Sequence, residues 1–328
     1  MAGRRFGLYF AWSRPQEVSA DLGVLENRYP TLFEFRRALW PVFEHLRSPS
    51  RYSQGIAGFL DHVILSDFDL FRRVIKEETG HDVPVIQRES VIQQEEAGKH
   101  PTPQRTQLDD SYFKGLDTLI IVSLDHFRTS QEASRGEIDT IGSFLQHEDH
   151  CLVVCPHHDI GADNLSASQQ VEFDHHADRL VPAQQRIGGF ARSVLNGLGF
   201  PIENRFGLNP ARMADGSPAP LYVNRDLDKL GVLQGVTTFN IHPHLPYLFV
   251  PPQVATQVEV LAQQQINLGA PRHPFVEAGN RVFNALLQLR SSSYAGKIFV
   301  CDATLWSSAF GGLNSLQAFW RNLARLPK

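Results

Sequence analysis

The sequence has few cysteines and no long apolar run. Cysteine stands only at positions 151, 155 and 301, and none of the three forms a CxxC pair, so neither a disulfide framework nor a structural zinc motif is expected. No apolar run approaches the roughly 18 to 20 residues that cross a bilayer. We therefore expect a cytoplasmic protein, in a reducing compartment, that spans no membrane.

Blocks of like charge are also lacking. The 31 basic and 35 acidic residues are interspersed and give a formal net charge of −4, which leaves no basic patch for nucleic acid or for an anionic membrane surface. With 42% hydrophobic and 20% charged residues, the composition is that of an ordinary globular protein. The expected partner is therefore a small-molecule substrate, and a homo-oligomer is left open.

What is present is an apolar pattern typical of an α/β chain with a mostly parallel sheet. Its clearest unit is a buried strand at 116–124, a helix at 129–146 and a second buried strand at 151–155. Thr129 and Glu132 have the spacing of a capping box at the start of that helix. A crossover of this length joins parallel strands by a right-handed connection, which makes the unit a βαβ motif.

The same patterns predict the remaining elements. Further strands are expected at residues 5–11, 63–65, 83–86 and 297–301, and further helices at 31–46, 68–79, 184–198, 253–265, 274–289 and 313–326. We expect a single α/β domain over residues 1–328. Pro and Gly indicate a surface loop or flap at 95–110 and a loop and hairpin insertion at 207–250, in which 235–241 and 247–250 would pair.

Several features of the second half occur together in one known superfamily. They are the strand LDTLIIVS, a following helix with an acidic residue, and a late strand, KIFVC, that enters Asp302 before a helix containing FWRNL. In this layout the chain, over roughly residues 115–328, resembles the class I glutamine-amidotransferase-like superfamily, including its trehalose-utilisation-type members. The resemblance implies a flavodoxin-like fold, a mostly parallel sheet with helices on both faces, here with insertions.

Cys155 falls where amidotransferases of that superfamily carry a nucleophilic cysteine. The glycines of the usual elbow are replaced here by Val154, Pro156 and His157, and Pro156 has no N–H to offer an oxyanion hole. The late His-Pro-Glu motif is also absent. The resemblance thus comes without the glutaminase motifs, and Cys155 is either a small buried hydrophobic residue or the nucleophile of a cysteine hydrolase.

Chemically active side chains follow the predicted strands. In an open parallel sheet, ligands bind outside the carboxyl ends of the strands. His126 comes just after the strand at 116–124, and Asp302 follows the strand at 297–301. His126, Cys155 and Asp302 are therefore the candidate catalytic residues, with His126 or Asp302 as a base or orienting group.

Three other residues are candidates for substrate binding. Arg14 follows the first predicted strand, and arginine binds carboxylates in a bidentate manner. His242 and His244 flank Pro243 in an extended segment, where residues two apart point the same way. An ion pair on the surface and a hairpin tip with exposed imidazoles are the respective alternatives.

Two doubled histidines lie near acidic residues, in PHHDIGADN and EFDHHADRLVP. Imidazole and carboxylate ligands suit Zn²⁺, Mn²⁺ or Fe²⁺, and a catalytic site keeps one position open for water. The candidate metal ligands are His157, Asp159, His175 and His176. No fixed pattern such as HExxH is present, so a solvated histidine-rich surface is the alternative.

Together these features favour a hydrolase or lyase that acts on a small polar metabolite. Its His/Asp-rich site, with or without a divalent metal (Zn²⁺, Mn²⁺ or Fe²⁺), would lie at the carboxyl ends of the strands. A non-catalytic ligand-binding or scaffolding domain and a cysteine hydrolase based on Cys155 are the alternatives, because a fold alone does not decide function.

Overall fold

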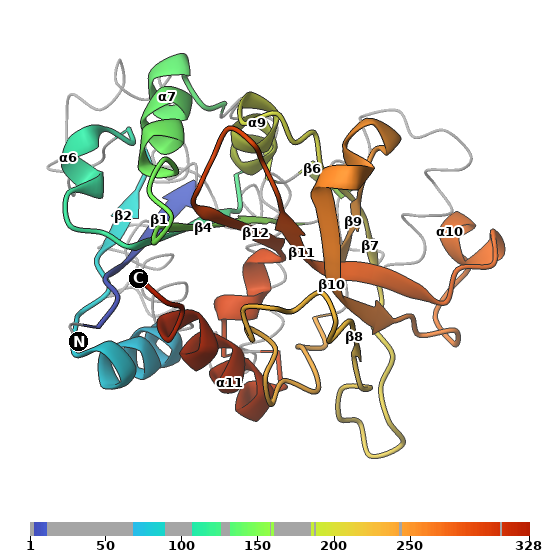
Figure 1. The fold of residues 1–328 in the computed structure, drawn as a ribbon. Helices are drawn as coiled ribbons and strands as arrows, with labels where there is room; N and C mark the ends of the chain where they lie inside the picture. Colours follow the sequence, from blue (N-terminus) through green and yellow to red (C-terminus); the bar gives the residue numbers. More distant parts are fainter. Residues whose placement is uncertain are drawn as a thin grey trace, which may run out of the picture.

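The computed structural model describes residues 3–11, 68–88, 107–125, 132–157, 159–160, 185–186, 188–242, 245–308 and 310–328. A mostly parallel sheet of eight strands, in the order β2-β1-β3-β4-β12-β11-β10-β8, runs through the molecule (Figure 1). The parallel part consists of β2 (Val85–Gln87), β1 (Phe6–Ala11), β3 (Thr118–Ser123), β4 (Cys151–Pro156) and β12 (Lys297–Cys301). The antiparallel extension consists of β11 (Val282–Leu289), β10 (Val258–Gln265) and β8 (Tyr222–Val223).

The central strands are buried along their whole length, as their continuous apolar sequences predict. In β1, β3 and β4 every residue is buried, which is the pattern of strands covered on both faces. Successive side chains point to opposite faces. Accordingly, Leu8 and Phe10 join one hydrophobic core, and Tyr9 and Ala11 join the other.

Helices cover both faces of this sheet (Figure 1). On one face lie α6 (Asp110–Phe113), α7 (Arg135–Phe144) and α9 (Gly189–Gly197), and on the other lie the helix at 68–79 and α11 (Leu313–Ala324). The predicted helix at 68–79 ends as expected before Gly80, whose φ of 77° favours glycine. Within the described part of the chain, no helix has the length and apolarity that crossing a membrane requires.

The predicted βαβ unit is present, but its helix starts later. The capping box is formed by Ser134 and Glu137 rather than by Thr129 and Glu132. Both pairs have the required spacing, and Glu132 lies before the helix. The glutamate of the second pair, Glu137, also pairs with the buried guanidinium of Arg88, which is distant in sequence.

The largest correction concerns residues 253–265 and 274–289, which were expected to be helices. Only η4 (Pro252–Gln257) and α10 (Pro274–Glu277) are helical there, and the antiparallel strands β10 and β11 take up most of the remainder. The apolar spacing of VEVLAQQQ and VFNALLQL fits either period over a short stretch. Both segments are strands because β11 pairs with the edge of β12 and β10 pairs with β11.

The insertion at 207–250 also differs from the predicted hairpin. Residues 235–241 are all described and form no strand, and β9 (Leu245–Phe249) pairs instead with β7 (Glu203–Leu208). The 239–242 segment packs against residues that follow β12 in the chain: Asn240 Nδ2 donates to Thr304 O at 2.9 Å, and Ile241 N donates to Phe310 O at 2.9 Å. Of the flap predicted at 95–110, only 107–110 is described, and the predicted elements at 31–46 and 63–65 lie outside the described residues.

Candidate functional site

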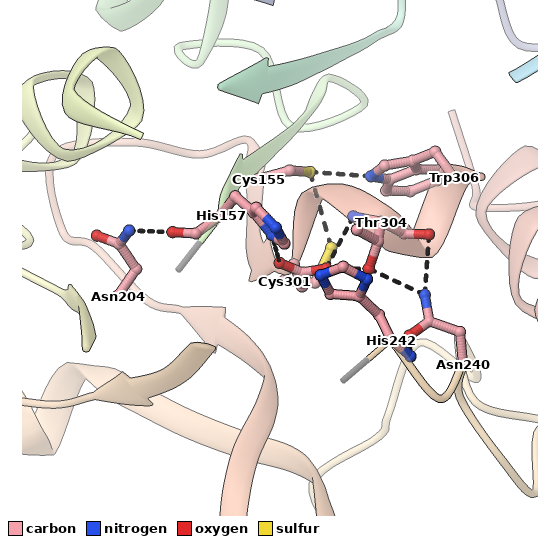
Figure 2. Close-up of polar contacts among 9 residues, drawn as sticks. Cys155, His157, Asn204, Asn240, His242, Cys301, Thr304 and Trp306 are labelled. Atoms are coloured by element: carbon pink, nitrogen blue, oxygen red, sulfur yellow. Dashed lines mark hydrogen bonds and ion pairs between the residues drawn. The ribbon is translucent and has the colours of Figure 1, made fainter. Parts of the chain in front are cut away.

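The carboxyl ends of β4 and β12 bring two predicted site residues into contact. Val154 and Val300 are paired in neighbouring parallel strands, so the residues just beyond them emerge at the same edge of the sheet. There His157 Nδ1 lies 2.9 Å from Asp302 Oδ1, and both side chains are buried (Figure 2). Two segments that are 145 residues apart thus form a His–Asp pair.

The carboxylate of Asp302 is held on both oxygens. Oδ1 faces His157, and Oδ2 accepts hydrogen bonds from Thr304 N at 2.8 Å and from the Thr304 hydroxyl. Burial by itself would raise the pKa of Asp302, but the charges of His157 and His242 and the hydrogen bonds from His157 and the Thr304 side chain together hold the pKa below its usual value. Asp302 is therefore an ionised group that can orient the imidazole of His157.

A second imidazole lies against this pair. The ring of His242 is 4.9 Å from that of His157 and 4.5 Å from that of Phe310, between centroids. Its backbone N donates to Asn240 Oδ1 at 3.3 Å. The structure thus brings His242, predicted to bind substrate, to the His–Asp pair, while its predicted companion His244 lies outside the described residues.

The backbone of His157 is supported by residues that the sequence did not single out. Asn204 Nδ2 donates to His157 O, and Arg192 Nη1 donates to Asn204 Oδ1 at 2.8 Å. Gly188, with a φ of 84°, packs so closely that a Cβ there would lie 3.2 Å from His157 N. No sequence signal marks Asn204 or Asn240, whereas Thr304 follows the strand at 297–301 together with Asp302, in the Asp-x-Thr spacing typical of a capping turn.

Cys155 lies in the hydrophobic core next to the His–Asp pair (Figure 2). Its Sγ accepts a hydrogen bond from Trp306 Nε1 at 3.1 Å and lies 3.7 Å from Cys301 Sγ. Burial, followed by the neighbouring Cys155, raises the pKa of the Cys301 thiol. This environment supports the interpretation of Cys155 as a buried hydrophobic residue, because reactive thiols need partial exposure and a stabilised thiolate.

Most other predicted site residues lie outside the described part of the chain. These are Arg14, His126, His175 and His176. Asp159 begins the two-residue strand β5 (Asp159–Ile160), which pairs with β6 (Gln185–Arg186), and its side chain is not described. Of the four predicted metal ligands, His157 alone has a described side chain, and its Nδ1 faces Asp302.

One Asp-Asp-His group in the described residues could hold a metal ion, at the opposite edge of the sheet. Asp117, Asp149 and His150 precede β3 and β4, and their potential ligand atoms lie within 4.8 Å of one another. Other partners compete for them, since Asp117 Oδ2 accepts from Arg5 N at 2.6 Å and lies 2.8 Å from Lys328 Nζ. This group was not among the predicted ligands, and its geometry is unspecific.

Asp125, at the carboxyl end of β3, caps α9 from a distance. Its Oδ1 accepts from the Ser123 hydroxyl, its Oδ2 accepts from Phe190 N at 3.1 Å, and its backbone O accepts from Gly188 N at 2.9 Å. Burial raises the pKa of this carboxyl, although both side-chain hydrogen bonds oppose the change. The native state therefore binds this proton more tightly than the unfolded chain does.

The Asp125→Asn variant is expected to become more stable than the wild type as the pH rises. The wild type loses free energy of unfolding above about pH 3.9, where an unfolded Asp ionises, until the higher native pKa is reached. The substituted amide would keep an acceptor for Phe190 N and turn its NH₂ group towards Ser123. Urea denaturation should give free energies of unfolding for the two proteins that lie within about 1 kcal/mol of each other at pH 4. Between pH 4 and pH 7 the value for Asp125→Asn should rise relative to that of the wild type. The exposed Asp139→Asn is the control, and a parallel pH dependence of Asp125→Asn and the wild type would contradict the prediction.

No protein-family model matches this chain, and neither does any curated protein sequence. The similarity to the amidotransferase-like superfamily therefore rests on the layout of the strands, Asp302 and the closing helix alone.

Proposed function

We propose that the protein is an enzyme, a hydrolase or lyase that acts on a small polar metabolite and uses His157 as its general acid–base. The observation that carries the proposal is the 2.9 Å contact between His157 Nδ1 and Asp302 Oδ1, buried at the carboxyl ends of two parallel strands. Groups held in this way recur where a proton must be moved at neutral pH.

The chemistry of the pair follows from its orientation. Asp302 accepts the hydrogen bond of the Nδ1–H group, which directs the basic nitrogen, Nε2, to proton transfer. From a water molecule, Nε2 takes the proton as the oxygen attacks a substrate, and it returns the proton to the leaving group. From a carbon next to a carbonyl, it takes a proton to begin an elimination. The first reaction is a hydrolysis and the second a lyase step.

The order of the parallel strands supports the location of the site. Counted along the chain, β2-β1-β3-β4-β12 has the order 2-1-3-4-5, which is that of flavodoxin-like sheets, where ligands bind at the carboxyl edge. We extend the proposal to a flavodoxin-like fold and to a distant relation with the amidotransferase-like superfamily. The three buried cysteines, none of them in a disulfide, support a cytoplasmic location.

The proposal includes no metal. A metal-dependent reaction would need Asp159, His175 and His176, whose side chains the structure does not describe. Cysteine hydrolysis is disfavoured by the contacts of Cys155 with Trp306 and Cys301. The non-catalytic alternative is an outcome of the following experiment.

A panel of esters, amides, phosphoesters and hydroxy acids should reveal turnover by the wild type, and His157→Gln should reduce it by about 100-fold or more. The control is His273→Asn, since His273 is equally buried but caps α10, where its Nδ1 accepts from Phe275 N at 3.1 Å, and Asn preserves a capping acceptor. Cys155→Ser should retain activity.

Full activity of His157→Gln would refute the acid–base role, and loss of activity in Cys155→Ser would favour the cysteine hydrolase. Ligand binding without turnover of any compound would favour the non-catalytic domain.

A further inference from the structure

A chain of side-chain hydrogen bonds runs from Asn240 through Thr304 to Asp302 and His157 (Figure 2). All four side chains are buried. The His–Asp pair is therefore continued by two neutral residues from other segments.

The amide of Asn240 has one possible orientation. Asn240 faces the carbonyl oxygen of Thr304 at 2.9 Å, and a carbonyl oxygen can only accept, so the facing atom is the Nδ2 amide nitrogen. The opposite atom, Oδ1, accepts from His242 N at 3.3 Å. A flipped amide would break contacts on both sides.

The orientation of the Asn240 amide determines which acceptor receives the hydrogen bond of the Thr304 hydroxyl. The second hydrogen of Asn240 Nδ2 is donated to Thr304 Oγ1 at 3.0 Å, so Oγ1 is an acceptor on that side. Its single hydrogen is then donated to Asp302 Oδ2, with which it is in hydrogen-bond contact. Asp302 Oδ2 also accepts a hydrogen bond from Thr304 N at 2.8 Å. Two donors on Oδ2 favour a carboxylate whose Oδ1 accepts from His157.

We propose that Thr304 is a positioning residue whose hydroxyl, oriented by Asn240, helps to keep Asp302 a carboxylate, so that its Oδ1 accepts a hydrogen bond from His157 Nδ1–H. The imidazole is thereby held in the tautomer whose Nε2 is basic, which is the tautomer that general-base chemistry requires. If Asp302 instead took up a proton from solvent, it would donate to Nδ1, and the neutral imidazole would carry its own proton on Nε2. The catalytic consequence rests on the proposed function, whereas the tautomer itself does not.

The contact has a purely structural alternative. Asp302 is the N-cap of the short helix η5 (Ala303–Trp306), and a cap needs only the backbone N of Thr304. The hydroxyl is an additional donor that Thr304→Val removes while the backbone N–H remains. Among the described residues, the titratable groups His242 and Cys301 lie beside the pair, and the Thr304 substitutions leave both in place.

The test is ¹⁵N NMR of the His157 ring in the neutral form. The wild type and Thr304→Ser should show one tautomer, with the proton on Nδ1, whereas Thr304→Val should show a mixture in which the other tautomer reaches about one tenth or more. Thr304→Ala, which adds no volume, replaces Thr304→Val if that variant unfolds. An unchanged Nδ1–H tautomer in both variants would overturn the proposal.

Kinetics give the second measurement. Thr304→Val should lower kcat by about 10- to 100-fold with little change in KM, and Thr304→Ser should restore it to within about threefold. Thr79→Val is the control, since Thr79 is also buried but its hydroxyl donates to Ile75 O at 2.7 Å, away from the site. If the wild type turns over nothing, the proposed function fails while the NMR result still decides the role of Thr304.

Discussion

Replacing Asp302 with Asn is expected to lower kcat by about 10⁴-fold while the protein remains folded. Thr304 N and the Thr304 hydroxyl both donate to the Oδ2 position, so the oxygen of the new amide must lie there. Its NH₂ group then faces His157 Nδ1 and requires that nitrogen to be an acceptor. The proton moves to Nε2, and the general base is lost although the geometry is nearly unchanged.

Three measurements check this prediction. Steady-state kinetics should show the loss in kcat with KM nearly constant, ¹⁵N NMR should show the proton on Nε2 of His157, and thermal unfolding should show a folded protein. Asp139→Asn, on the exposed face of α7, is the control for removal of one charge. Activity of Asp302→Asn within about tenfold of the wild type would mean that His157 does not act as the base.

The largest loss of stability is expected for Glu137→Ala, at about 3–5 kcal/mol. Glu137 Oε1 lies 2.5 Å from Arg88 Nη1, and both side chains are almost fully buried. Oε1 also accepts from Leu108 N at 3.2 Å, and Oε2 accepts from Ser134 N at 2.9 Å. Alanine would leave the Arg88 guanidinium buried without a counter-charge and would remove half of the capping box.

Urea denaturation at neutral pH measures this effect. Asp139→Ala is the matched control, because Asp139 lies in the same helix and pairs with Arg135 at 3.0 Å, but both are exposed; we expect a loss of at most about 0.5 kcal/mol. The double variant Arg88→Met with Glu137→Leu should recover much of the loss. A loss of less than about 1 kcal/mol in the free energy of unfolding of Glu137→Ala would contradict the prediction. It would show that the Arg88–Glu137 pair does not stabilise the contact between α7 and the end of β2.

The sequence predicted the parallel half of the sheet well because its strands are continuous apolar runs. Strands with continuous apolar runs such as LIIVS and CLVVC have two apolar faces, and both faces are buried only when helices cover the sheet on both sides. It failed for β10 and β11, whose spacing is ambiguous over eight residues and whose strand conformation depends on pairing with β12, a contact between distant segments. A local sequence pattern contains no information about pairing with a distant segment.

The candidate site divides in the same way. Sequence alone determined that His157 and Asp302 would follow strands of one parallel sheet, and hence that their side chains would reach a common edge. Only the tertiary structure decided that they touch each other, that Asn240 and Thr304 complete the chain of hydrogen bonds, and that Cys155 lies in the core. The physical reason is that the positions of the buried strands along the chain follow from local apolar pattern, whereas hydrogen bonds between side chains depend on distances of a few tenths of an ångström between segments far apart in the chain.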